Sequence, residues 1–197
     1  MSVNSTEEYT LTDYLESAWH GIPLDAAVAG YITVIPLLLT MVSTFVYIPM
    51  RKLLIVYNLF AAIAISLAFI ADITLYPFWE FKLDASFLIY IDSPSNAFAS
   101  VSTSFIVLRI LMAAALAAAL YSVLHFVSPS SLRPTKHRFL SLLTTTIIGG
   151  LLFLAIRGGI GESTNNIGKV YYSEKTFLNH SAVNPVFSFI YSLGKRE

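Results

Sequence analysis

Few residues of this chain have the types and spacing that chemistry requires. Glu162-Ser163-Thr164 sets a carboxylate beside two hydroxyl groups, an arrangement that a metal-assisted nucleophile could use. However, no strand pattern precedes it, and no Asp-His pair or cluster of carboxylates follows. The glycines Gly158, Gly159 and Gly161 do not make a phosphate loop, because no strand precedes them and no Gly-Lys-Ser/Thr follows. We therefore predict no catalytic residue in this chain.

Metal and cofactor chemistry is equally hard to place. The chain contains 4 histidines and no cysteine. The histidines share no ligand spacing, and the lack of cysteine removes thiolate sites and a thiol nucleophile. We therefore predict no metal site and no cofactor within this chain.

Four residues are candidates for contact with lipid: Arg109, Asp72, Asp25 and Trp79. Arg109 is a full charge inside an apolar stretch, where an isolated guanidinium costs roughly 2.5 to 3.5 kcal/mol. It can extend to the head groups, pair with Asp72, or bind an anionic lipid head group. Asp25 can cap a helix or contact a lipid or ion. Trp79 can belong to an aromatic belt or to the wall of a head-group groove.

The elements that must position these residues are four long apolar stretches. Hydrophobic residues make up 56% of the chain and charged residues 12%, about half the charged share of soluble domains. Each stretch reaches the roughly 18 to 20 residues that cross a bilayer as a helix. We predict an all-α, polytopic membrane protein with four transmembrane helices and short interfacial helices. The spans are expected at residues 26–50, 53–71, 101–127 and 139–156.

Three segments flank or connect these spans on one side. Residues 1–25 should form an outer interfacial segment, with an amphipathic helix over residues 10–20 that Thr10 and Asp13 cap. Residues 72–92 should form an outer aromatic loop, with Pro77 ending the helix before it. Residues 157–197 should form a folded juxtamembrane segment, with a helix beginning at Asn184-Pro185.

The charges predict an orientation. The connection after the first span holds Arg51 and Lys52, and residues 128–138 hold three further Lys or Arg. The charged residues within 1–24 and 72–92 are mainly acidic. Because basic loops favour the cytoplasmic side, both chain ends should lie outside. We expect a multi-pass protein of the bacterial cytoplasmic membrane, and the acidic start suggests that a further span precedes Met1.

Nearly the whole sequence resembles a known family. Residues 157–189, with Gly168-Lys169-Val170-Tyr171-Tyr172-Ser173 and Asn184-Pro185, resemble the segment after the last span of lipoteichoic acid synthase-like phosphoglycerol transferases, particularly those of Bacteroidetes. Trp19 to Asp25 is similar to the family's entry to its second span, and Asp72 to Asp92 to its outer loop. The resemblance implies five spans and an extracytoplasmic sulfatase-like domain with a threonine nucleophile and a divalent metal, usually manganese. The first span and that domain are not in this chain, so no nucleophile or metal ligand is assigned.

The expected function follows from that resemblance. The chain would anchor the catalytic domain of a phosphoglycerol or phosphoethanolamine transferase near its phospholipid donor, suspected to be of the phosphatidylglycerol type. Its partners would be membrane lipids and that catalytic domain, and its zero net charge does not point to nucleic acid. Two alternatives remain open: a small transporter or channel, and a structural membrane subunit that recruits a separate enzyme.

Overall fold

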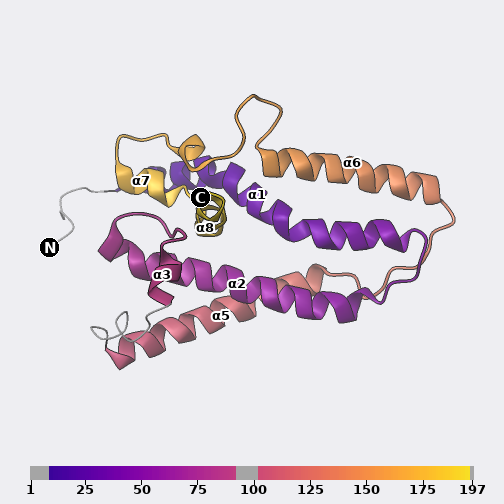
Figure 1. Ribbon diagram of the computed structural model, residues 1–197, viewed down its shortest axis with the longest axis horizontal. Helices are drawn as coiled ribbons and strands as arrows, with labels where there is room; N and C mark the ends of the chain where they lie inside the picture. Colours follow the sequence, from indigo (N-terminus) through magenta and orange to yellow (C-terminus); the bar gives the residue numbers. More distant parts are fainter. Residues whose placement is uncertain (1–8, 92–101, 196–197) are drawn as a thin grey trace. The chain divides into compact units, whose positions relative to one another are not determined.

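The computed structural model describes residues 9–91 and 102–195, and this part of the chain contains helices but no strand. Figure 1 shows the helices, which are α1 (Leu11–Ser43), α2 (Met50–Trp79), α3 (Phe87–Ile91), α5 (Thr103–Val127), α6 (Arg138–Arg157), the 3₁₀ helix η1 (Ile167–Val170), α7 (Thr176–Ser181) and α8 (Pro185–Leu193). Of these, α1, α2, α5 and α6 are long and apolar enough to cross a membrane. The predicted fold class, an all-α polytopic membrane protein, is confirmed.

The first span differs from its predicted boundaries. The expected interfacial helix over residues 10–20 is continuous with the first apolar stretch, and α1 ends at Ser43 rather than near residue 50. Asp25 lies inside this helix, so the prediction that it caps a helix was wrong. The capping pair was predicted correctly, since the Thr10 backbone N–H donates to Asp13 Oδ2 at 2.7 Å and the Asp13 N–H donates to Thr10 Oγ1 at 3.3 Å.

The second span also extends further than predicted. Pro77 does not end α2, which continues to Trp79. Glu80 has a φ of 56°, a left-handed conformation that a helix cannot continue, and its N–H donates to the Tyr76 carbonyl at 2.8 Å. The helix therefore ends at a backbone reversal at Glu80, and Pro77 lies in its last turn.

The chain forms two compact units that are not sequential. The first unit consists of Met1–Asp25, Ala68–Ile110 and Asn165–Glu197, and the second of Ala26–Leu67 and Leu111–Thr164. This grouping differs from the predicted division into residues 1–25, 26–156 and 157–197. The N-terminal and C-terminal segments belong to one unit because they pack on each other, as described below.

In the second unit, α1 and α6 pack closely at small residues, side by side in Figure 1. A Cβ added to Gly30 would lie 2.6 Å from Ile156 Cγ1, so only glycine fits there. Gly149 faces Leu37, and the hydroxyls of Thr44 and Ser141 lie 3.0 Å apart. The contacts advance along α1 as they recede along α6, so the two helices are antiparallel. Small residues allow such close approach where no water drives helix association.

Polar side chains join the other helices of the second unit. The Asn58 amide of α2 donates to Ser128 Oγ at 2.9 Å, and the Ser66 hydroxyl donates to the Ala113 carbonyl at 2.5 Å. These two bonds connect α2 to α5 and to the residue after it. Within lipid, every polar group needs a protein partner, so such bonds specify which helices meet.

One of these bonds compensates for a proline. Pro36 lies inside α1 and has no N–H to donate to the Ile32 carbonyl, four residues earlier. The hydroxyl of Tyr57 on α2 donates to that carbonyl instead, at 2.7 Å. The proline thus creates an acceptor that ties α1 to α2.

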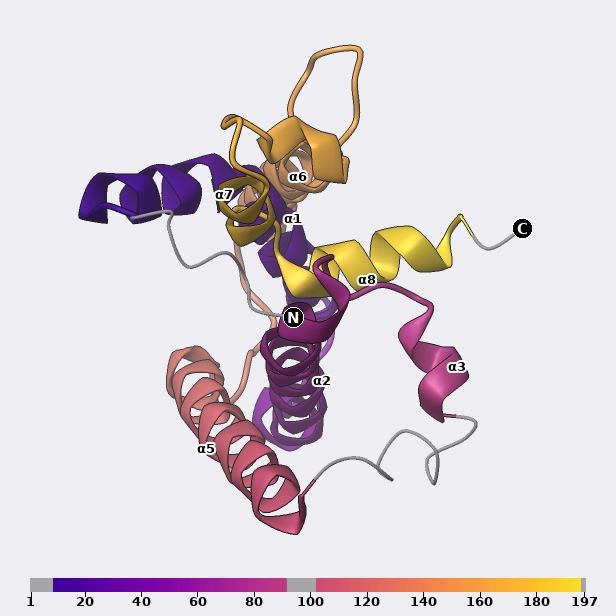
Figure 2. The same cartoon turned by 90° about the vertical axis from the view of Figure 1, so that its left-hand side faces the viewer.

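In the first unit, the C-terminal segment packs on the first turns of α1. The Ser17 hydroxyl lies 2.6 Å from the Tyr172 hydroxyl and 3.3 Å from the Leu178 carbonyl. A Cβ on Gly21 would lie 2.8 Å from the Ala182 carbonyl oxygen, so glycine is needed here for close approach rather than for a turn. Figure 2 shows α7 beside α1, with α8 running in a different direction.

Candidate functional site

The first unit contains a cavity of about 320 Å³. Its wall comes from all three segments of the unit, with α1, α2 and the connection from α7 to α8 each contributing. The lining residues are Ser17, Ala18, Gly21, Asp25, Phe69, Asp72, Ile73, Lys82, Ser181, Ala182, Val183, Asn184 and Pro185. Three charged side chains are therefore brought to one cavity from positions spread over 58 residues of sequence, from Asp25 to Lys82.

Two of these charges form an ion pair. The Lys82 ammonium contacts Asp72 Oδ2, and the Leu83 backbone N–H donates to Asp72 Oδ1 at 2.9 Å. The side chains are only 12% and 8% exposed. Burying such charges is costly unless they are paired and hydrogen-bonded, and here both conditions are met. The pair fixes the chain that follows α2 against the end of that helix.

Asp25 has no such cationic partner. Within the described residues, its one hydrogen bond comes from the Asn184 amide, which donates to Asp25 Oδ1 at 2.6 Å. Asn184 is held in turn because its own Oδ1 accepts from the N–H groups of Val186 and Phe187 at the start of α8. The predicted helix start at Asn184-Pro185 is confirmed. Asp25 thus presents an exposed carboxylate on a positioned side chain.

A hydrogen-bonded wall supports the α1 side of the cavity. The Tyr172 hydroxyl donates to the Asp13 carbonyl at 3.2 Å, and its ring stacks on His20 with centroids 4.3 Å apart. The Asn179 side chain accepts from the N–H groups of Tyr172 and Ser173 and donates to the Ser173 carbonyl. The loop before α7 is therefore held in one conformation.

A histidine lies beside this wall. His180 Nδ1 is 3.0 Å from the Tyr76 hydroxyl, and the two rings meet edge to face. Burial lowers the pKa of His180 below its ordinary value of 6.5, and the nearby Lys82 lowers it further, while Asp72 acts in the opposite direction. The neutral imidazole is therefore favoured in the folded protein.

The structure brings together two of the four predicted lipid-contact residues. Asp25 and Asp72 line the cavity, whereas Arg109 and Trp79 are not among its lining residues. Arg109 lies over the Phe105 ring, with Cζ 4.8 Å from the centroid, and Trp79 stacks on Phe81. The carboxylate of Asp72 takes Lys82 as its ion-pair partner rather than the Arg109 considered from the sequence.

Sequence reasoning missed three lining residues: Lys82, Asn184 and Ser17. Lys82 had a signal, since it is the one basic residue in residues 72–92. Asn184 was recognised as a helix cap, but its second role, holding Asp25, depends on a contact across 159 residues. Nothing in the sequence marks Ser17, because its partners also lie far along the chain.

The charges that line the cavity indicate the kind of ligand it can hold. Within residues 9–91 and 102–195, no group of three or more His, Cys, Asp or Glu side chains is arranged to hold a metal ion. A cation paired with one carboxylate and a second, separate carboxylate can instead receive a polar head that carries both an anionic group and hydrogen-bond donors.

Comparisons with protein-family models, with curated proteins and with solved structures find no match to this chain.

Proposed function

We propose that this chain is a membrane-anchoring domain that holds a phospholipid head group for a lipoteichoic acid synthase-like transferase. The observation that carries the proposal is the cavity of the first unit, where Asp25, Asp72 and Lys82 meet. The volume of about 320 Å³ lies near the lower end of small-molecule pockets. That size suits a head group whose acyl chains remain in the bilayer.

Each charged residue has a role in this proposal. The Lys82 ammonium has three donors, and only one is needed for Asp72, so another is left for a phosphate oxygen. Asp25 accepts hydrogen bonds from donors at the far end of the head group. Glycerol hydroxyls and a primary ammonium both supply such donors, whereas the quaternary ammonium of choline has none. Phosphatidylglycerol and phosphatidylethanolamine therefore fit better than phosphatidylcholine.

The proposed orientation follows from the basic residues. Arg51, Lys52, Arg133, Lys136 and Arg138 all belong to the two connections at one end of the second unit. If they lie in the cytoplasm of a bacterium, the residues before α1 and after α6 lie on the outer side of the cytoplasmic membrane, because each span crosses it once. The head-group cavity would then open where an extracytoplasmic catalytic domain works, and anchoring would raise its effective concentration at the lipid.

The catalytic step itself belongs to that domain, which the resemblance places after the C-terminal segment. Its divalent metal, usually manganese, finds no fitting donor set among the described residues of this chain. We therefore derive no metal-dependent step here, and the proposed partners of this chain are phospholipid and the catalytic domain.

Lipid selection by the purified chain tests the proposal. The chain is reconstituted with equal amounts of phosphatidylglycerol, phosphatidylethanolamine and phosphatidylcholine, extracted in mild detergent, and the retained lipids are quantified by mass spectrometry. We expect the first two to be enriched. Asp25→Asn keeps the acceptor for Asn184 but removes the charge, and should reduce the enrichment about tenfold, since a hydrogen bond to a charged group contributes about 1.5 to 3 kcal/mol.

Glu80→Gln is the matched control, because Glu80 is an exposed acid of the same unit that does not line the cavity. It should retain lipids as the unmodified chain does. Equal retention of all three lipids, or an equal loss in both variants, would contradict the proposed role of the cavity.

A further inference from the structure

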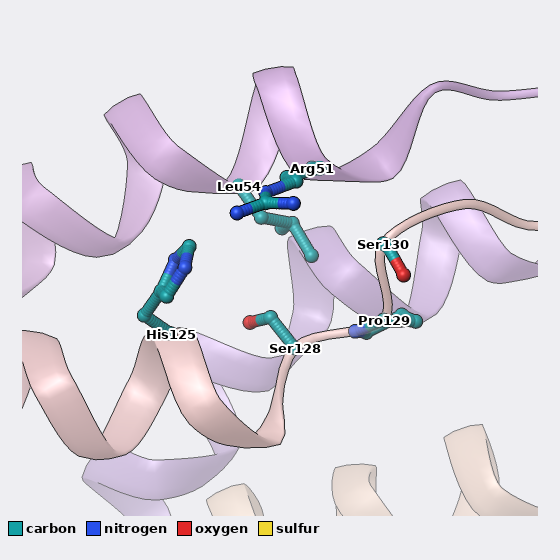
Figure 3. Close-up of a pocket in the computed structure, with 6 residues that line it drawn as sticks. All are labelled: Arg51, Leu54, His125, Ser128, Pro129 and Ser130. Atoms are coloured by element: carbon teal, nitrogen blue, oxygen red, sulfur yellow. The ribbon is translucent and has the colours of Figure 1, made fainter.

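A second cavity lies within the second unit, and none of the residues considered so far for lipid contact lines it. Its volume is about 150 Å³, and it is lined by Arg51, Leu54, His125, Ser128, Pro129 and Ser130. Figure 3 shows the His125 ring, near the end of α5, extending toward the guanidinium of Arg51 on α2, while the hydroxyl of Ser128, the residue after α5, points toward His125. Three kinds of hydrogen-bonding group thus converge from two helices and the loop that follows α5.

The frame of this cavity is fixed by backbone bonds. Ile48 and Leu132 form an isolated antiparallel bridge with N···O distances of 3.2 and 3.3 Å. The Arg51 N–H donates to the Ser130 carbonyl at 3.0 Å. Below them Met50 and Leu54 are 0% and 2% exposed. None of these contacts uses the side chains of Arg51 or His125, so the frame positions these groups without neutralising them.

The polar side chains that line this cavity differ in whether they form hydrogen bonds within the protein. The Ser128 hydroxyl accepts from Asn58 and donates to the Leu124 carbonyl, so both of its roles are taken. The His125 ring stacks on Tyr121 with centroids 5.6 Å apart. Among the described residues, no hydrogen bond is made by the Arg51 guanidinium or by the ring nitrogens of His125.

No carboxylate lines this cavity to neutralise the guanidinium. The one acidic residue in the sequence of this unit is Glu162, which follows α6 and is not a lining residue. In addition, Arg51 is the second residue of α2, where the partial positive charge of the helix N-terminus favours anions. The lining is therefore cationic, and its natural complement is an anion from outside the unit.

We propose that this cavity binds a phosphate group, held by the Arg51 guanidinium with the His125 ring beside it and Ser130 at the rim. A guanidinium matches two phosphate oxygens at once, which makes it suited to phosphate rather than to a small halide ion. The volume of about 150 Å³ accommodates one phosphate group but not a nucleotide. The phosphate can belong to a phospholipid head group or be free in solution. This site is independent of the cavity in the first unit.

Thermal unfolding of the purified full chain in phosphate-free detergent tests the proposal. The probes are inorganic phosphate, at constant ionic strength, and short-chain phosphatidylglycerol, with diacylglycerol of the same chains as the phosphate-free comparison. We expect at least one phosphate-bearing probe to raise the Tm, while diacylglycerol does not. A response to phosphatidylglycerol alone identifies a lipid head group as the ligand, and a response to inorganic phosphate identifies a soluble one.

Arg51→Gln should weaken binding of the active probe about tenfold or more, by loss of the bidentate contact. Lys52→Gln is the matched control: it removes the neighbouring charge from an exposed residue outside the cavity and should respond as the unmodified chain does. Ser130→Asp, at an exposed position on the rim, places a repelling charge without touching the buried frame, and should also lose the response.

Two results would overturn the assignment. One is that neither phosphate-bearing probe raises the Tm of the unmodified chain. The other is that Arg51→Gln and Lys52→Gln respond equally. If Arg51→Gln does not fold, Ser130→Asp decides: a lost response supports the site, and an unchanged response rejects it.

Discussion

At the scale of single residues, side-chain hydrogen bonds hold together segments that are far apart in the sequence. Asn184 shows the principle, since one side chain both caps α8 and holds Asp25. Asn179 similarly satisfies three backbone groups of the loop at Tyr172 and Ser173. In a chain with few charges, such amides do the positioning that ion pairs do in many soluble proteins.

The bond from Tyr57 to the Ile32 carbonyl leads to a double-mutant prediction. Tyr57→Phe should destabilise the protein by about 1 to 2 kcal/mol, because it leaves an acceptor unsatisfied in an apolar setting. Pro36→Ala restores an intrahelical N–H for that carbonyl, so Tyr57→Phe should cost less in the Pro36→Ala background. Thermal unfolding of the four proteins measures the coupling. Tyr31→Phe, an exposed tyrosine on α1, should have little effect, and a coupling of zero would refute the explanation.

The environment of His180 predicts a dependence of stability on pH. Its pKa is lowered in the folded state, first by burial and then by Lys82, from an ordinary value of 6.5. The unfolded chain therefore binds more protons at mildly acidic pH, and the stabilisation present above 6.5 is lost as the pH falls toward the folded pKa. Tm should fall with acidification in the unmodified chain and less steeply in His180→Gln. His20→Gln should keep the full slope; the same slope in His180→Gln would show that another group is responsible.

At the scale of elements, close approach rather than hydrophobicity distinguishes one helix pair from another. All four long helices are apolar, so lipid and protein neighbours offer them similar contacts. Gly30 allows α1 and α6 to approach each other, while Asn58 and Ser66 join α2 to the α5 segment. Small and polar residues therefore select partners that apolar surface alone does not.

Gly30 and Gly150 form a matched pair for testing this view. Gly30→Leu would place side-chain atoms on Ile156, whose Cγ1 is already 2.6 Å from an added Cβ. It should separate α1 from α6 and lower the Tm by several degrees, as overpacking costs typically about 1 to 3 kcal/mol. Gly150 has nothing within 4 Å of an added Cβ, so Gly150→Leu should be tolerated. Equal stability of the two variants would argue against the packing described.

At the scale of the whole molecule, the absence of cysteine from the sequence makes the proposed orientation directly measurable. Glu174→Cys labels the first unit and Ser131→Cys labels the loop before α6, both at exposed positions. In intact cells, a membrane-impermeant maleimide should react with Glu174→Cys and not with Ser131→Cys. Both should react after the membrane is permeabilised. The reverse pattern would place the basic connections outside and remove the basis for an extracytoplasmic head-group cavity.

The two proposed sites give separate binding roles to the two units. The first unit holds a mixed-charge cavity, and the second a cationic one. The chemistry that each accepts follows from local charge: carboxylates with a lysine in one case, and an arginine without any carboxylate in the other. Asp25→Asn should therefore lower the lipid enrichment, and Arg51→Gln the response to phosphate, by the same amount alone as when the two substitutions are combined.

The sequence by itself determined that the chain is helical and crosses a membrane, and it located the four spans to within a few residues at most ends. Length and apolar content are local properties, and in lipid they permit little besides a helix. Local capping chemistry likewise identified Thr10 with Asp13 and Asn184 with Pro185. The continuity of α1 and the end of α2 were missed, because Asp25 was interpreted as the cap of a new helix and Pro77 as a helix end. The actual end of α2 is the backbone reversal at Glu80.

Tertiary structure alone decided which charges meet. Asp25 and Asp72 were recognised as candidates, but their partners, Asn184 and Lys82, follow from how three segments fold into one unit. The grouping of Arg51 with His125 had no sequence signal at all, because α2 and the end of α5 are far apart in the chain. The hydrogen bond that joins them, from the Asn58 amide to the Ser128 hydroxyl, links residues 70 positions apart. Periodicity reports which face of a helix is apolar, whereas a binding cavity depends on which faces of distant helices are brought together.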